Sequence, residues 1–333
     1  NMLTQAQSEY KRLTLRLGFT MLLFVGLFFG YSMLMPAMQL LFTLTLKNAV
    51  LSDILYEIVY GLLYAVCFAL PVYFFRLISP ENRSFHVRTE WKLPSFAPLY
   101  IFAGIAVIMA AAYLNAYLLE IFHYNDFIGE LTDESYTQNY QLILAFFTTA
   151  VVPGFVEEFL FRGLILEKLL PYGRETAVIF SALLFGLMHQ NAGQFLYATV
   201  AGLVLGYLYV ITRSIWCGVL LHFSNNFFSV LMGALSERLP GATGNAVTYL
   251  INFAVMAVGF TAAVFLLFRV KDNRLEAQRS GCFGRSLPLH PDAGTVELPW
   301  RDRVRLFFPY SMIIFTVIAC LEMGGYLLMA VLR

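Results

Sequence analysis

Stretches of about 20 predominantly apolar residues recur from one end of the chain to the other, and each is long enough to cross a hydrocarbon core of about 30 Å as a helix. Lipid offers no hydrogen bonds to exposed backbone groups, so such stretches cross a membrane as α-helices. Only 13% of the 333 residues are charged, about half the fraction in an average soluble protein. The sequence therefore predicts an all-α fold, a polytopic bundle of transmembrane helices.

We predict about nine transmembrane spans, with ends accurate to several residues. The spans are residues 14–35, 52–75, 97–122, 141–168, 175–191, 194–212, 214–235, 246–269 and 308–331. Residues 1–270 are expected to form a membrane-embedded helical bundle, residues 271–307 a polar cytoplasmic loop, and residues 308–333 an additional C-terminal transmembrane helix.

The distribution of basic residues tests this number of spans. With the N-terminus in the cytoplasm, eighteen of the 22 Lys and Arg residues fall in cytoplasmic segments, and Arg162 lies within a span. The remaining three, Lys47, Arg238 and Arg333, are outside, as is an acidic loop at residues 123–139. Positive charge is retained on the cytoplasmic side of membranes. We therefore expect a multi-pass protein of the cell membrane with a cytoplasmic N-terminus. The net charge of +1 gives no reason to expect binding to nucleic acid.

Four polar sites interrupt the apolar spans. They are Glu157-Glu158 with Arg162, Phe185 with His189, His222 with Asn226, and a lone Glu322. An ionisable group at membrane depth is costly unless it is paired or functional. In each of the first three sites two residues are four apart, which places them on one helix face.

The helical angles around residue 157 separate the two carboxylates. Glu158 and Arg162 are four residues apart with the acid first, the favourable order for an ion pair. Glu157 is rotated by about 100° from this pair and keeps no partner within its own helix, so it is suited to take a proton from water. Pro153 frees the backbone carbonyl of Thr149, which membrane helices tolerate where the freed group faces a cavity or another helix.

Distances along the chain predict that these groups meet at one depth. Glu157 precedes the centre of the turn at residues 171–173 by about 22 Å, and His189 follows it by about 25 Å, at 1.5 Å per residue. His222 lies about 14 Å beyond Arg213 on the same count. We expect a single site that opens toward the cytoplasm.

These motifs resemble those of the CPBP family, the CAAX-prenyl-protease and bacteriocin-processing intramembrane proteases, also called the Abi family. The family pattern EExxxR, FxxxH and HxxxN is matched by residues 157–162, 185–189 and 222–226, in the same order and in successive spans. The resemblance covers about residues 140–235, the expected catalytic core, and implies an eight-helix type of CAAX-protease bundle.

The resemblance also implies a role for each polar residue. Glu157, helped by His189, would activate a water molecule for attack on a peptide carbonyl. His222 and Asn226 would line an oxyanion hole, where each hydrogen-bond donor can lower the barrier by about 3 kcal/mol. Glu158 and Arg162 would support the site. The implied function is an intramembrane endopeptidase that cleaves a hydrophobic, prenylated or leader-type peptide.

Metal dependence stays open between two alternatives. Glu157, His189 and His222 could supply a zinc site with one open position. The chain has no HExxH motif, however, and asparagine is a poor zinc ligand, so we favour a metal-free, glutamate-activated water and expect no certain cofactor. The expected partners are membrane lipids and a peptide or protein substrate that can carry a lipid.

Two other functions are compatible with the sequence. One is a non-catalytic immunity or scaffold protein of the same family. The other is a proton-coupled transporter that uses Glu157, Glu158 and Glu322 as a relay, although transporters usually contain paired, repeat-related broken helices. The small residues Ala198 and Gly202 share one helix face with Gly206, which predicts close helix packing.

Overall fold

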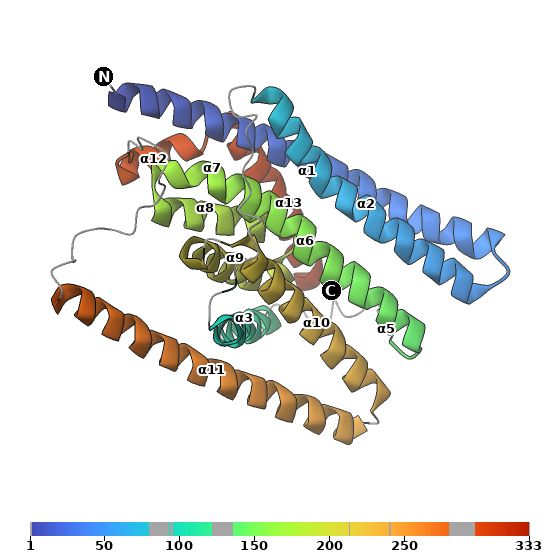
Figure 1. The fold of residues 1–333 in the computed structure, drawn as a ribbon. Helices are drawn as coiled ribbons and strands as arrows, with labels where there is room; N and C mark the ends of the chain where they lie inside the picture. The colour runs from blue at the N-terminus through green and yellow to red at the C-terminus, as the bar shows by residue number, and fades with distance from the viewer. Residues whose placement is uncertain are drawn as a thin grey trace.

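Helices account for every regular element in the part of the chain that the computed structural model describes. These residues are 2–79, 93, 96–121, 136–212, 214–239, 241–279 and 297–332, and they contain no strand (Figure 1). The all-α prediction is confirmed. The separate helices are α1 (Met2–Thr45), α2 (Ala49–Ile78), α3 (Ala97–Glu120), α8 (Arg174–Leu187), α9 (Ala192–Thr212), α10 (Ile215–Arg238), α11 (Gly241–Arg279), α12 (Trp300–Phe307) and α13 (Tyr310–Val331).

Residues 139–172 form one continuous helical segment, which we call the central rod. Its parts are α5 (Asn139–Ala145), η2 (Phe146–Val151), α6 (Val152–Glu158), η3 (Phe159–Leu166), α7 (Glu167–Leu169) and η4 (Leu170–Tyr172). Two of these parts, η2 and η3, are π-helical, so they are wider than an α-helix. Such turns inside α-helices are rare and frequently mark functional sites. The rod ends where Gly173 adopts a φ of 149°, as the predicted turn requires.

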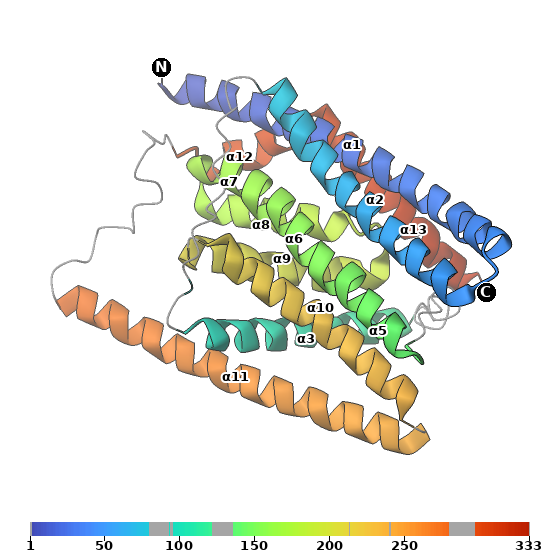
Figure 2. The ribbon, with the colours of Figure 1, turned by 45° about the vertical axis from the view of Figure 1, so that its right-hand side comes forward.

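The helices are arranged around the central rod. The hairpin of α1 and α2 covers one side of the molecule and α11 covers the opposite side, with the rod, α8, α9 and α10 between them (Figures 1 and 2). Helix α13 packs along α1, and α11 packs along α3. The rod is therefore enclosed by other helices over much of its length.

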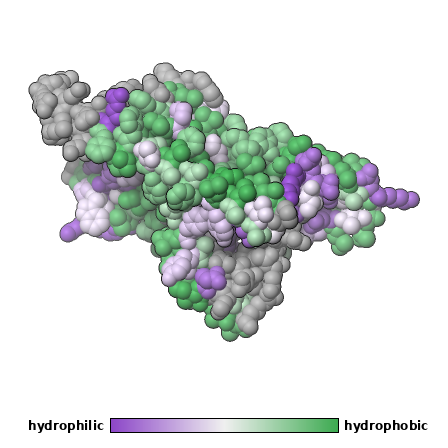
Figure 3. All heavy atoms as spheres, turned by 90° about the horizontal axis from the view of Figure 1, so that it is seen from below, coloured by the Kyte–Doolittle hydropathy of each residue, from purple (hydrophilic) through white to green (hydrophobic). Residues whose placement is uncertain are grey.

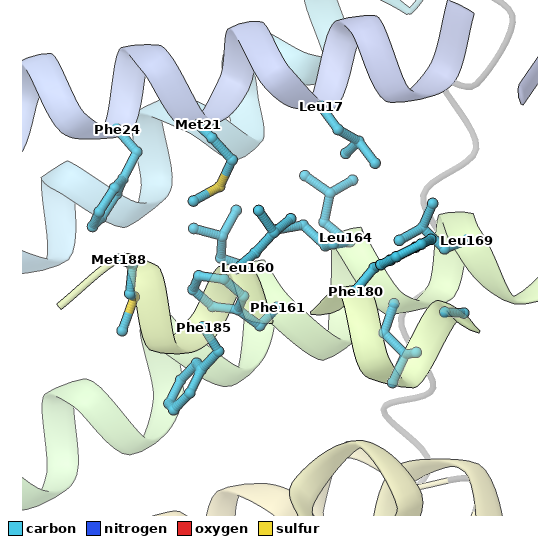
Figure 4. Close-up of a cluster of buried hydrophobic side chains, with 14 of the residues drawn as sticks. Leu17, Met21, Phe24, Leu160, Phe161, Leu164, Leu169, Phe180, Phe185 and Met188 are labelled. Atoms are coloured by element: carbon cyan, nitrogen blue, oxygen red, sulfur yellow. The ribbon is translucent and has the colours of Figure 1, made fainter. Parts of the chain in front are cut away.

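The main apolar core joins α1 to the central rod and α8. Leu17, Met21 and Phe24 project from α1 toward Leu160 and other apolar side chains of η3 and α8 (Figure 4). Leu17 and Met21 have no exposed surface, and Phe24 is 1% exposed. This packing fixes the motif-bearing part of the rod relative to the first helix of the chain.

Eight helices, and not the nine predicted, are long and apolar enough to cross a membrane in the described part of the chain. The difference is the segment predicted as a span at residues 175–191. It forms α8, whose 14 residues extend only about 21 Å. The chain turns at residues 188–191, where Gln190 has a positive φ of 57°. This turn is tied to α3 because the side chain of Asn115 donates to the carbonyl of Gly193 at 2.7 Å.

The outer surface of the bundle is apolar. Apolar side chains dominate the coloured part of the face in Figure 3, and on α11 Phe253 and Leu267 are 72% and 70% exposed. A surface of this kind is stable in lipid and would aggregate in water. With eight apolar helices of sufficient length, the chain is a multi-pass membrane protein.

Both ends of the predicted polar segment at residues 271–307 are helical. Helix α11 continues to Arg279, and residues 300–307 form α12. Phe307 of α12 is buried and stacks on Phe180 of α8 with ring centroids 3.8 Å apart. Residues 280–296 of that segment, and most of the acidic loop at 123–139, lie outside the described residues. The predicted last span is confirmed as α13.

Gly202 allows α8 and α9 to approach closely, as the small-residue face predicted. A Cβ atom on Gly202 would lie 2.8 Å from the Cα atom of Ala182 and 3.0 Å from its Cβ atom. Gly202→Ala should therefore force the two helices apart and lower the free energy of unfolding by about 1–3 kcal/mol. Thermal unfolding in detergent measures the change.

Gly30→Ala is the matched control for this prediction. Gly30 is also in a helix, but no atom lies within 4 Å of a Cβ atom built there. The control should leave stability unchanged or raise it by up to about 1 kcal/mol, because alanine favours a helix more than glycine does. Equal unfolding temperatures for the two variants would contradict the close packing of α8 and α9.

Candidate active site

The central rod brings two carboxylates and an arginine into the protein interior. Glu157 is 3% exposed, and Glu158 and Arg162 have no exposed surface. Arg162 Nη1 donates to Glu158 Oε1 at 2.9 Å, so the ion pair predicted from the spacing of four is present. Arg162 Nη2 also donates to the carbonyl of Gly202 at 3.2 Å. Its guanidinium lies 4.5 Å from the centre of the Phe185 ring, within cation–π distance.

His222 of α10 connects the two carboxylates. Its Nδ1 lies 3.0 Å from Glu158 Oε1, and its Nε2 lies 3.7 Å from Glu157 Oε2. Because an ionised carboxylate can only accept, Nδ1 carries the hydrogen of the bond to Glu158. That bond fixes the ring and directs Nε2 toward Glu157. A distance of 3.7 Å is too long for a direct hydrogen bond, so Nε2 and Oε2 face each other without bonding.

The backbone near Pro153 behaves as the sequence predicted. The carbonyl of Thr149, which the proline leaves without its helical donor, accepts a hydrogen bond from Asn226 Nδ2 at 3.0 Å. Asn226 is thus held against the central rod, one turn beyond His222 on α10. Both members of the predicted oxyanion hole, His222 and Asn226, bond to the rod, and each keeps a second nitrogen or hydrogen that these bonds do not use.

His189 follows the C-terminal end of α8, close to the other polar groups. Its Nδ1 donates to the carbonyl of Phe185 at 2.9 Å, and it lies within electrostatic range of Glu157 and His222. The ring of Phe185 contacts both imidazoles, with centroid distances of 5.3 Å to His189 and 5.8 Å to His222. Phe185 therefore packs in the centre of the polar cluster.

Two tyrosines near Glu157 were missed by sequence reasoning. Tyr64 of α2 donates its hydroxyl hydrogen to Glu157 Oε1 at 2.5 Å. Tyr197 of α9 lies within electrostatic range of Glu157. Glu157 thus lacks a partner in its own helix, as predicted, but it has one from another helix. Neither tyrosine belongs to a motif, and tyrosines are frequent in this chain, so no sequence signal marks them.

Glycine positions show how tightly this cluster is packed. A Cβ atom on Gly218 of α10 would lie 2.8 Å from Glu158 Oε2, and one on Gly154 would lie 3.3 Å from the backbone nitrogen of Phe223. Glycines at these two positions let α10 approach the central rod. The close approach of the helices brings His222 within reach of both carboxylates.

The structure gives no direct support for the zinc alternative. Across the described ranges, no three His, Cys, Asp or Glu residues are grouped as ligands of one metal ion. The Nδ1 atoms of His189 and His222 each bond to an oxygen of the protein, as they also do in histidines that bind a metal through Nε2. We derive no step through a metal.

Glu322 lies on α13, apart from the motif-bearing helices. Helix α13 packs mainly on α1, and Glu322 Oε2 is buried without a hydrogen-bond partner in the described part of the chain. No contact to Glu157 or Glu158 is recorded, so the relay of three glutamates receives no support.

The geometry describes a membrane protein whose central helices hold a cluster of two carboxylates, an arginine and two histidines, all of them buried except the partly exposed His189. Residues 139–228 match the family model described as type II CAAX prenyl endopeptidase, Rce1-like. The match contains all seven motif residues and confirms the resemblance to the CAAX proteases. This segment, which is less than half of the chain, is similar to a family of proteases. No curated protein and no solved structure is detectably similar to the chain.

Proposed function

We propose that the protein is an intramembrane endopeptidase of the CAAX-protease type, in which Glu157 activates a water molecule. The observation that carries this proposal is the facing pair of Glu157 Oε2 and His222 Nε2, 3.7 Å apart in a buried position. Two atoms at this separation can both hydrogen-bond one water molecule that lies beside them. Oε2 has no other hydrogen-bond partner among the described residues, so it is free to take the proton.

The remaining residues have supporting roles in this proposal. The ion pair of Glu158 and Arg162 holds Nδ1 of His222, so that Nε2 keeps its direction toward the reacting atoms. As Glu157 takes the proton, the water oxygen attacks the peptide carbonyl, and negative charge develops on the carbonyl oxygen. In this proposal His222 is an imidazolium with hydrogens on both nitrogens, so Nε2 can donate to that oxygen, and preorganised donors at a developing oxyanion lower the barrier.

Asn226 and His189 complete the proposed site. The amide nitrogen of Asn226 has two hydrogens, and the bond to Thr149 uses one of them. The second is available to the oxyanion. His189, held through its Nδ1, keeps Nε2 free to receive the proton that Glu157 took from water and to deliver it to the leaving amine.

The proposed substrate is a hydrophobic peptide or protein segment near a C-terminus, with or without a prenyl group. The family match supports this substrate class. The excess of basic residues in the predicted cytoplasmic segments supports a cell-membrane location with a cytoplasmic N-terminus.

Purified protein in lipid nanodiscs should cleave a fluorescent peptide that ends in a prenylated cysteine followed by three residues. Mass spectrometry should detect release of the terminal tripeptide, and the prenylated peptide should react faster than the same peptide without the lipid. Treatment with a strong chelator should leave the rate unchanged. Absence of cleavage of both peptides by folded protein would contradict the proposed function, and activity restored only by added zinc would contradict the metal-free site.

A further inference from the structure

Tyr64 contacts the proposed base from outside the segment that matches the protease family. It lies on α2, whereas the match covers residues 139–228. Its hydroxyl donates to Glu157 Oε1 at 2.5 Å, across 93 residues of sequence. Hydrogen bonds to an ionised carboxylate are shorter and stronger than those between neutral groups.

Aromatic packing holds the ring of Tyr64 in place. Its centroid lies 5.0 Å from that of Phe68 and 6.3 Å from that of Tyr60, residues one turn away on either side of α2. From α1, Phe28 and Tyr31 each approach the ring with centroids at 6.1 Å. Four rings on two helices therefore restrict the direction in which the hydroxyl can point.

The bond from Tyr64 makes the two oxygens of Glu157 unequal. Oε1 accepts the tyrosine hydrogen, whereas Oε2 is buried, lacks a hydrogen-bond partner in the described ranges, and faces His222 Nε2. A carboxylate without this anchor could rotate and exchange its two oxygens. We propose that Tyr64 is a positioning residue that locks Oε1 of Glu157 and so presents Oε2 to water and substrate. This inference rests on the proposed function, in which Glu157 is the base.

Charged and titratable groups reach Glu157 from every helix around it. Glu158 and Arg162 belong to its own rod, His189 follows α8, Tyr197 lies on α9 and His222 on α10. None of these groups has a recorded hydrogen bond to Glu157 within the described residues, whereas Tyr64 has one. If the Tyr64 hydroxyl is removed, none of these groups is therefore expected to supply the lost hydrogen bond to Glu157.

Tyr64→Phe tests the inference because it removes the hydroxyl and keeps the ring in its aromatic packing. A hydrogen bond to a charged group contributes about 1.5–3 kcal/mol, so kcat should fall by about tenfold to a hundredfold with little change in KM. The ionised form of Glu157 also loses a donor, so the acidic limb of the profile of kcat/KM against pH should move up by about one pH unit. A purely structural role for Tyr64 would not move this limb.

Tyr60→Phe is the matched control. It removes a hydroxyl from the same face of α2, one turn away, and its ring packs on that of Tyr64. The control should keep the acidic limb of the wild-type profile. Equal profiles for the Tyr64 and Tyr60 variants would overturn the inference.

An infrared titration tests the same inference without a substrate. The carboxylic acid band that is present in wild-type protein and absent in Glu157→Gln reports protonation of Glu157. In Tyr64→Phe the midpoint of this band should move to higher pH, whereas in Tyr60→Phe it should not. If the midpoint in Tyr64→Phe is unchanged, the role of Tyr64 is overturned. The proposed function is not affected by that result, provided that the wild-type protein cleaves peptide. Full activity of Glu157→Gln would overturn both.

Discussion

Glu157→Gln is expected to lower kcat/KM for peptide cleavage by about a hundredfold to ten-thousandfold, because an amide cannot take a proton from water. The substitution is nearly isosteric, and its amide oxygen can still accept the hydrogen bond from Tyr64. It also removes a buried charge. We therefore expect the variant to unfold at the wild-type temperature or above it, as measured by differential scanning fluorimetry in detergent.

Glu322→Gln provides the comparison for this result. Glu322 is another carboxylate of the membrane-spanning helices, but it lies on α13 and contacts none of the motif residues in the described part of the chain. The control should cleave peptide at the wild-type rate. Wild-type turnover by Glu157→Gln would contradict the role of Glu157 as the base, and equal losses in the two variants would contradict a role that is specific to Glu157.

Arg162→Met is expected to destabilise the protein strongly. Arg162 is fully buried, and it donates to Glu158 and to the carbonyl of Gly202. Methionine fills much of the same volume but leaves the carboxylate of Glu158 without its main counter-charge. Breaking a buried ion pair from one side typically costs about 3–5 kcal/mol. The free energy of unfolding, measured by steric trapping in bicelles, and the amount of protein in the membrane should both fall.

A double variant separates the lost charge balance from the lost packing. Arg162→Met combined with Glu158→Gln removes both charges, so its stability should lie well above that of Arg162→Met alone. Its activity should remain low, because Glu158 no longer holds His222 through an ionic bond. A double variant as unstable as the single one would contradict the importance of the ion pair.

Local spacing along the sequence was sufficient to predict part of the site. The separation of four residues identified the pair of Glu158 and Arg162, and Pro153 identified the free carbonyl of Thr149. Both predictions depend on the geometry of a single helix, which is nearly the same in every protein. The helical class and most spans followed in the same way from the length of the apolar stretches.

Contacts between distant helices could not be predicted from the sequence. The bond from Tyr64 to Glu157 joins α2 to the central rod, and no spacing rule connects residues 93 positions apart. The bond from His222 to Glu158 likewise depends on how closely α10 packs, which Gly218 permits. The family resemblance implies an oxyanion-hole role for His222, and it gives no sign that His222 also lies between the two carboxylates, as the structure shows.

The early end of α8 has a different cause. The predicted span at residues 175–191 includes the polar residues His189, Gln190 and Asn191, whereas the helix ends before them at Leu187. The turn is stable at this depth because side chains satisfy its backbone: Asn191 donates to the carbonyl of His189 at 2.9 Å. Irregular backbone is tolerated inside membrane proteins where the protein itself supplies such partners.

A single-turnover cleavage in ¹⁸O-labelled water, followed by mass spectrometry of both product and protein, tests most directly whether Glu157 acts on water. If Glu157 removes a proton from the attacking water, the label will enter the new C-terminal carboxylate of the cleaved peptide, and the Glu157 side chain will stay unlabelled. Label in the Glu157 carboxylate would show that it attacks the peptide itself, which would contradict the mechanism.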